Sequence, residues 1–189
     1  MKSKKLLSII LALAMMFSVL PASTVLVHAE AITETISADT TWNDGDTVGG
    51  VTISGGTVTI NGDVGITAEI TIKGNVTFTG GGTLNRMSPS GNLIKVESGS
   101  LTLNNVTIDG TNVTISDSWT AAAINMAGGT VIMNDGAKIT NHKRTSGYGP
   151  AVYMAGGNFK MKGGTISGCE SRNYGGAIYL DGGSFEMNG

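Results

Sequence analysis

The chain of 189 residues contains 29 glycines, 3 prolines and 1 cysteine, and 14% of its residues are charged. Every glycine lies beyond residue 29, so glycine makes up about 18% of the other 160 residues (189 minus 29), against roughly 7% in average proteins. This content excludes a mostly helical protein, because each interior glycine costs a helix about 1 kcal/mol. An apolar content of 40% with a net charge of −2 argues against disorder. We therefore expect an all-β protein.

Residues 1–29 contain, in order, the three regions of a secretory signal peptide. Three lysines within the first five residues precede an apolar run from Leu6 to Leu20, and Val27-His28-Ala29 provides a small-residue cleavage site. This run is shorter than the roughly 20 residues that span a membrane. Cleavage after Ala29 would leave 9 basic and 14 acidic residues, a formal charge of −5 (9 minus 14). We expect a secreted or cell-surface protein of bacterial type, with no stable membrane span in the mature chain. Its negative charge gives no basic surface for binding nucleic acid.

Residues 30–50 are expected to form an N-terminal cap, because Ala31 to Trp42 is polar and contains no pair of glycines, and solenoids need capped ends. Beyond them, short apolar runs alternate with threonine, which is typical of strands. These runs are Val51-Thr52-Ile53, Val58-Thr59-Ile60, Ile70-Thr71-Ile72 and Val76-Thr77-Phe78. They predict early coils of a β-helix over residues 51–189, but their spacing leaves the register before residue 93 open.

The C-terminal half contains an internal repeat. Residues 123–134, 151–162 and 177–188 align, and a weaker copy begins near residue 93. Ile124 and Val152 are 28 residues apart, and Val152 and Ile178 are 26 apart. Each copy holds three short strands, which are stable only if they stack on their equivalents in the next copy. The repeat predicts a parallel β-helix solenoid with about 26–30 residues per coil, two tight corners and one longer loop.

The aligned positions predict which residues turn, face inward or face solvent. Glycine pairs should form the same corner in each coil, because glycine adopts positive φ at little cost: Gly128-Gly129, Gly156-Gly157 and Gly182-Gly183. Two inward columns should follow them, one of Val131, Phe159 and Phe185, the other of Met133, Met161 and Met187. On the outside we expect an ion pair between Lys160 and Glu186. We also expect an amide ladder of Asn104, Asn134 and Asn188, with Lys162 breaking the series.

Two motifs in the last repeat resemble a known family. Gly175-Gly176-Ala177-Ile178 and Phe185-Glu186-Met187-Asn188 are similar to the GGAI and FxxN motifs of polymorphic outer-membrane protein repeats. More broadly, the repeats over residues 93–189 resemble the right-handed parallel β-helix of pectin-lyase-like proteins. The resemblance implies a right-handed solenoid and a surface-exposed adhesin.

The sequence contains no pattern of a catalytic site. Glycoside hydrolysis needs paired carboxylates, but Asp44, Asp109, Asp135 and Asp181 each precede a glycine, as turn formation alone predicts. The mature chain has one histidine, His142, which lies outside any Gly-His-Gly motif. We expect no cofactor and no bound metal, and whether the protein is an enzyme stays open, with a binding role favoured.

The longer loops carry the candidate ligand-contact residues. Tyr148 and Tyr174 are 26 residues apart, so they should occupy equivalent places on adjacent coils, beside Lys143, Arg144 and Arg172. Aromatic and charged side chains on loops of a rigid scaffold suit contacts to extracellular glycans or host proteins. The alternative is that the two tyrosines only pack over the edge of the coil.

These observations predict a secreted or cell-surface β-helix repeat protein that acts as an adhesin or a glycan- or protein-binding scaffold. Because the repeat stops at Gly189 in the middle of a coil, we expect a fragment of a longer protein. The alternative is the N-terminal part of an extracellular polysaccharide lyase or glycoside hydrolase whose catalytic coils lie further along.

Overall fold

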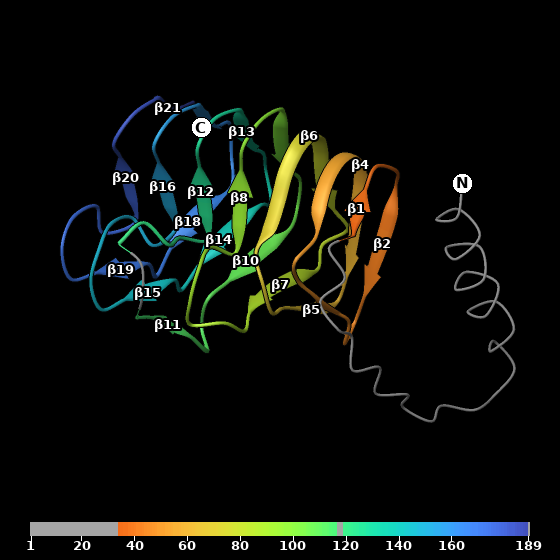
Figure 1. The fold of residues 1–189 in the computed structure, drawn as a ribbon, viewed down its shortest axis with the longest axis horizontal. Helices are drawn as coiled ribbons and strands as arrows, with labels where there is room; N and C mark the ends of the chain where they lie inside the picture. Colours follow the sequence, from red (N-terminus) through yellow and green to blue (C-terminus); the bar gives the residue numbers. More distant parts are fainter. Residues whose placement is uncertain (1–33, 117–118, 189) are drawn as a thin grey trace, which may run out of the picture. The chain divides into compact units, whose positions relative to one another are not determined.

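The structure is a computed structural model that describes residues 34–116 and 119–188. These residues form 21 strands joined by turns and loops, two of ten residues each and the others of two to four. They contain no helix, and so none that could cross a membrane. The predicted signal peptide lies outside the described residues. Figure 1 shows the strands following one another from the orange N-terminal coils to the blue C-terminal ones.

The strands form three sheets, A, B and C, in which all the pairings are parallel. Sheet A contains β1 (Thr35–Ile36), β2 (Thr40–Asn43), β4 (Thr52–Asn61), β6 (Ile70–Thr79), β8 (Ile94–Val96), β9 (Ser100–Leu103), β12 (Ile124–Met126), β13 (Thr130–Met133), β16 (Val152–Met154), β17 (Asn158–Met161), β20 (Ile178–Leu180) and β21 (Ser184–Met187). Sheet B contains β3 (Thr47–Val48), β5 (Asp63–Ile66), β7 (Thr83–Arg86), β10 (Thr107–Asp109), β14 (Lys138–Thr140) and β18 (Thr165–Ser167). Sheet C contains β11 (Thr114–Ile115), β15 (Lys143–Arg144) and β19 (Glu170–Ser171).

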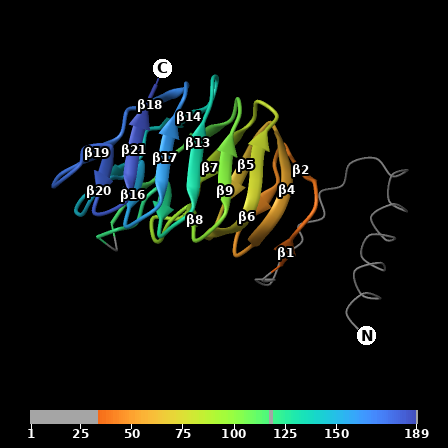
Figure 2. The same ribbon diagram turned by 90° about the horizontal axis from the view of Figure 1, so that it is seen from above.

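Each coil stacks on the one before it. Ile94 pairs with Ile124, Ile124 with Val152, and Val152 with Ile178, so the residues that the repeat equates are register partners. Figure 2 shows the same order in the strands β4, β6, β9, β13, β17 and β21, which lie side by side. This all-β arrangement of parallel strands is compatible with a parallel β-helix or β-solenoid.

The long loop of the repeat is more regular than the sequence suggests. It contains β11, β15 and β19, each of two residues, and these form sheet C. A two-residue strand is too short to show a period, so the sequence pattern could not reveal it. Residues 34–48, within the segment expected to form a cap, contain β1, β2 and β3, which pair with β4 and β5 and so build a coil of their own.

The interior is made of the predicted apolar columns. Val131, Phe159 and Phe185 are consecutive register partners, as are Met133, Met161 and Met187. The rings of Phe159 and Phe185 stack with centroids 5.5 Å apart. Packing in these columns removes apolar side-chain surface from water, which stabilises the fold by about 25 cal/mol per Å² buried.

The outward ladders form only in part. Asn134 Nδ2 donates to Asn104 Oδ1 at 2.6 Å, as the amide ladder predicts. Asn188 does not extend that ladder, because Lys162 occupies the equivalent place in the coil between it and Asn134. The Asn188 amide donates to the Glu186 carboxylate instead. Lys160 and Glu186 are register partners, but the ion pairs found among the described residues do not include them. The expected cross-rung ion pair is therefore absent there.

The second glycine of each corner has no room for a side chain. Gly129, Gly157 and Gly183 all have positive φ, between +69° and +80°. A Cβ on Gly157 would lie 2.6 Å from the carbonyl oxygen of Gly129 in the previous coil. Successive coils therefore lie close together at these corners, and the glycines permit the approach as well as the turn.

We predict that Gly157→Ala lowers the free energy of unfolding by about 2 kcal/mol or more, since it combines a left-handed backbone with a clash against Gly129. Gly176→Ala is the matched control, because a Cβ on Gly176 would meet nothing within 4 Å. Urea titration followed by circular dichroism measures both. Equal losses in the two variants would contradict the close approach of the coils.

His142 is fully buried in the loop between β14 and β15. Neither of its ring nitrogens has a hydrogen-bond partner of good geometry among the described residues. Burial, with a smaller contribution from the charge of Arg86, lowers the pKa of His142 from 6.5 to about 3. The histidine is therefore neutral in the folded protein at neutral pH.

This neutral histidine makes stability depend on pH. The pKa of His142 is lower in the folded protein than in the unfolded chain, so the unfolded chain binds the proton first as the pH falls. The free energy of unfolding is therefore highest above pH 6.5 and decreases as the pH falls toward 3. At pH 4.5 the protein should have lost about 2 to 3 kcal/mol more than the His142→Leu variant. Urea unfolding of both proteins between pH 7.5 and 4.5 tests this, and parallel pH profiles would refute it.

Candidate binding surface

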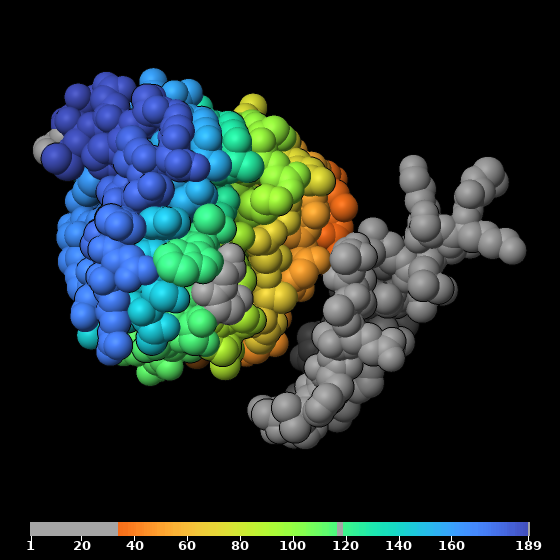
Figure 3. All heavy atoms as spheres, turned by 60° about the vertical axis from the view of Figure 1, so that its left-hand side comes forward, coloured from red at the N-terminus to blue at the C-terminus, as the bar shows by residue number. Residues whose placement is uncertain are grey.

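The candidate ligand-contact residues gather where sheet C is followed by sheet A. Tyr148 and Tyr174 form an isolated parallel bridge, so they occupy the equivalent positions that their spacing predicts. Lys143 lies on β15, next to its register partner Glu170 on β19. Arg172 is exposed in the loop before Tyr174. Figure 3 brings this side of the described part forward, with the last coils in blue.

Tyr148 is the centre of a cluster of five aromatic rings. Its ring centroid lies 4.4 Å from that of Tyr179, 5.7 Å from Tyr174, 5.9 Å from Trp119 and 6.5 Å from Tyr153. Tyr153 and Tyr179 also stack on each other at 5.9 Å, with their planes 10° apart. All of these separations fall in the range in which aromatic pairs attract, each pair contributing about 0.5–1.5 kcal/mol beyond its buried area.

The rings belong to two columns that run from coil to coil. The first contains Trp119, Tyr148 and Tyr174, and the backbone N–H of Tyr148 donates to the carbonyl oxygen of Trp119 at 2.9 Å. The second contains Tyr153 and Tyr179, which are register partners on β16 and β20. The stacking of coils therefore produces the stacking of rings.

Trp119, Tyr153 and Tyr179 were not among the residues predicted from sequence. A signal was present for the two tyrosines, because each follows a loop tyrosine by five residues (148 to 153 and 174 to 179). The signal for Trp119 was weaker. It lies six residues before Asn125, the register partner of Tyr153, so one extra residue displaces it from the pattern.

The two ends of the first column are open to solvent while its middle is covered. Trp119 is 57% exposed and Tyr174 is 65% exposed. Tyr148 is half-buried between them, and Tyr153 is buried. The inner rings therefore pack over the coil, as the alternative reading of the loop tyrosines expects, while Trp119 and Tyr174 present exposed apolar surface.

Two glycines let the rings come together. Gly149 and Gly175 directly follow Tyr148 and Tyr174, and both have positive φ. A Cβ on Gly149 would lie 2.6 Å from the backbone nitrogen of Tyr179, and one on Gly175 would lie 2.8 Å from the Cβ of Tyr179. Any other residue at either position would push the loop away from Tyr179 and separate the rings.

Arg144 supports the cluster from inside. Its side chain is buried, and its guanidinium donates to the carbonyl oxygens of Ser146, Ala121 and Tyr148, the last at 2.9 Å. A buried guanidinium needs such acceptors to offset the loss of water. Of the five predicted contact residues, Arg144 therefore holds the loop in place instead of facing a ligand.

Charges around the exposed rings are balanced. Lys143 Nζ lies 3.8 Å from Glu170 Oε2, with both side chains exposed. Tyr153 donates from its hydroxyl to Asp181 Oδ2 at 3.3 Å, and burial, aided by Asp181, raises the pKa of this tyrosine. With Arg172, the surface carries two cations and two anions.

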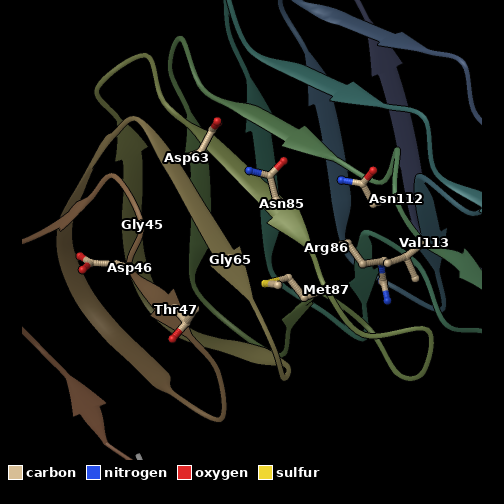
Figure 4. Close-up of a pocket in the computed structure, with 10 residues that line it drawn as sticks. All are labelled: Gly45, Asp46, Thr47, Asp63, Gly65, Asn85, Arg86, Met87, Asn112 and Val113. Carbon is tan, nitrogen blue, oxygen red and sulfur yellow. The ribbon is translucent and has the colours of Figure 1, made fainter. Parts of the chain in front are cut away.

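A depression of about 590 Å³ lies elsewhere on the molecule, on sheet B beside β3, β5 and β7 (Figure 4). It is lined by polar residues that include Asp46, Asp63 and Asn85, with Arg86 and Met87 at one side. The two carboxylates point in different directions in Figure 4. Within residues 34–116 and 119–188, no group of three or more His, Cys, Asp or Glu side chains could hold a metal ion. The aromatic cluster is therefore the stronger candidate site.

Comparison with known proteins finds no match to a protein-family model, to a curated protein or to a solved structure.

Replacing the central ring should cost more stability than replacing an outer one. We predict that Tyr148→Ala lowers the free energy of unfolding by about 2–4 kcal/mol, because four ring contacts and half-buried surface are lost. Tyr174→Ala, which removes a single ring contact from a largely exposed side chain, should cost about 1 kcal/mol. Urea unfolding measures both, and a larger loss for Tyr174→Ala would show that Tyr148 is not the centre.

Proposed function

We propose that the chain is a secreted or cell-surface binding protein, a parallel β-helix of right-handed type whose aromatic surface holds carbohydrate chains in the manner of an adhesin. The observation that carries the proposal is the pair of exposed rings, Trp119 and Tyr174, each packed against the same half-buried Tyr148. Secretion rests on the signal-peptide pattern of residues 1–29, and the handedness rests on the resemblance of the repeats.

The chemistry of the surface favours a sugar. A pyranose ring has an apolar face of C–H bonds, which packs against an exposed aromatic ring and excludes water from both. Its hydroxyls can then bond to polar groups beside the rings, and Lys143, Glu170, Arg172 and Asp181 supply donors and acceptors of both signs. A surface with balanced charge suits a neutral polysaccharide better than a polyanion.

The rigidity of the cluster should add to affinity. The rings are held by stacking, by the buried Arg144 and by the pairing of adjacent coils, so little side-chain freedom is lost when a ligand binds. Large aromatic side chains with two χ angles are common anchors of binding surfaces for the same reason.

We predict that Trp119→Ala combined with Tyr174→Ala weakens binding to neutral polysaccharides about five- to 150-fold, since two ring contacts of about 0.5–1.5 kcal/mol each, together about 1–3 kcal/mol, are lost. Binding is measured by depletion from suspensions of cellulose, chitin and xylan and by affinity electrophoresis in soluble glucans and mannans. Met87→Ala is the matched control, because Met87 is 56% exposed on the sheet B side and should bind like the wild type.

Two results would overturn the proposal: equal binding by the double variant and the wild type, or binding to none of these polymers by the folded wild type. Binding to a host surface protein that is lost in the double variant would keep the site but replace the ligand class.

A further inference from the structure

Two columns of threonines lie side by side on the outer surface of sheet A. Each column crosses three neighbouring coils, the first on β4, β6 and β9 and the second on β2, β4 and β6. Figure 2 shows β4, β6 and β9 next to one another. The columns lie on the side of the stack of coils, so their exposure does not depend on the ends of the stack. We call the six side chains the threonine face: Thr57, Thr77 and Thr102 in the first column, and Thr41, Thr59 and Thr79 in the second.

The interior of the coil holds the threonine face in place. Val58 and Phe78, which lie between the threonines of β4 and of β6, are fully buried. Because successive side chains of a strand point to opposite faces, the threonines point outward, where each one is at least partly exposed. Branching at Cβ restricts their χ1 angles. The hydroxyl and methyl groups of the face therefore have nearly fixed positions.

The threonine face is a regular net. Neighbouring strands of a sheet lie about 4.8 Å apart, and residues two positions apart along a strand are separated by about 6.6 Å. Thr57 and Thr77 are register partners and so have the first spacing, whereas Thr57 and Thr59 have the second. Hydroxyl and methyl groups thus recur at two fixed repeats, one along the stack of coils and one along the strands.

The hydroxyls of the threonine face are available to solvent. Within residues 34–116 and 119–188, the hydrogen bonds made by side chains involve none of these six hydroxyls, while Thr140 and Thr111 do bond to Asp109. The face also carries no charge. Its continuation on β13 is uncharged as well, since Thr130 and Ile132 are the register partners there of Ser100 and Thr102.

These properties suit few partners. Three coils and two columns cover about 200 Å² (from the strand and residue spacings), far less than the roughly 800 Å² that each partner buries in a stable protein interface. A second protein chain is therefore a poor occupant. The proposed glycan surface relies on exposed aromatic rings, and the threonine face contains none. Without charge, the face has no attraction for ions or polyelectrolytes.

An ordered lattice of water fits the face better. In ice the oxygen atoms are fixed at regular spacings, and several crystal planes have repeats of similar size to the two repeats of the threonine face. Hydroxyls at matching spacings can therefore bond to many lattice positions at once. Each such bond is weak because liquid water offers the same bond, but a rigid array makes all of them together and loses little side-chain freedom on binding.

We propose that the threonine face binds ice and that the protein thereby slows the growth of ice crystals. Adsorbed molecules hold back the ice front where they sit, so that ice can grow only between them and the freezing temperature falls. This activity is separate from glycan binding, because the aromatic cluster lies on the later coils and their loops, around β16 and β20.

Ice growth in solutions of the purified chain tests the proposal. The chain should lower the freezing temperature of a single crystal below its melting temperature and should inhibit recrystallisation of frozen sucrose solutions. Thr77→Lys places a long charged side chain in the middle of the first column and should abolish both effects. Thr59→Lys, in the second column, replaces it if circular dichroism shows that Thr77→Lys is unfolded.

Thr83→Lys is the matched control. Thr83 is also a half-buried, outward threonine on an internal strand, but it belongs to β7 of sheet B, between Asp63 and Thr107. This variant should act on ice like the wild type. A folded wild type with no more effect on ice growth than serum albumin overturns the proposal, and so does a folded Thr77→Lys or Thr59→Lys variant that keeps full activity. Equal loss in Thr83→Lys would also overturn it, because the effect would not belong to the threonine face.

Discussion

The structure depends on parallel, in-register stacking of one coil on the next. Strands of two to four residues have too few hydrogen bonds to be stable by themselves, so each one is held by its equivalents in the neighbouring coils. This stacking requires the backbones of successive coils to come close together at the glycine corners, where the carbonyl of Gly129 leaves no space for a side chain on Gly157. The glycine content that first excluded helices is thus also the condition for the coils to pack.

The aromatic surface is a product of the same stacking. A residue type that recurs at one place in the repeat becomes a column in space, as in the phenylalanines and methionines of the interior and the tyrosines of the loop. On the inside, such columns exclude water. On the outside, the same repetition produces a row of rings whose positions the backbone fixes, and this rigidity is what the proposed binding role requires.

Much of this arrangement could be predicted from the sequence, because residues that align in the repeat occupy the same place in successive coils. Alignment was enough to place Val152 beside Ile124 and Tyr148 beside Tyr174. Sheet C escaped prediction because its strands have two residues each. Arg144 was expected to contact a ligand because it lies near the loop tyrosines in sequence. Its burial with three carbonyl acceptors is a property of the folded loop that no local pattern reveals. The ion pair expected between Lys160 and Glu186 does not form among the described residues, where the Glu186 carboxylate accepts from Asn188.

The central claim is that neighbouring coils lie in register, with the rings of successive coils in contact. Nuclear Overhauser measurements on the folded protein test it most directly. The account predicts cross-peaks between the ring protons of Tyr148 and Tyr179 and between those of Phe159 and Phe185, whose centroids are 4.4 and 5.5 Å apart. A well-dispersed spectrum that lacks both sets of cross-peaks, or that shows contacts shifted by one residue along the strands, would contradict the stacking.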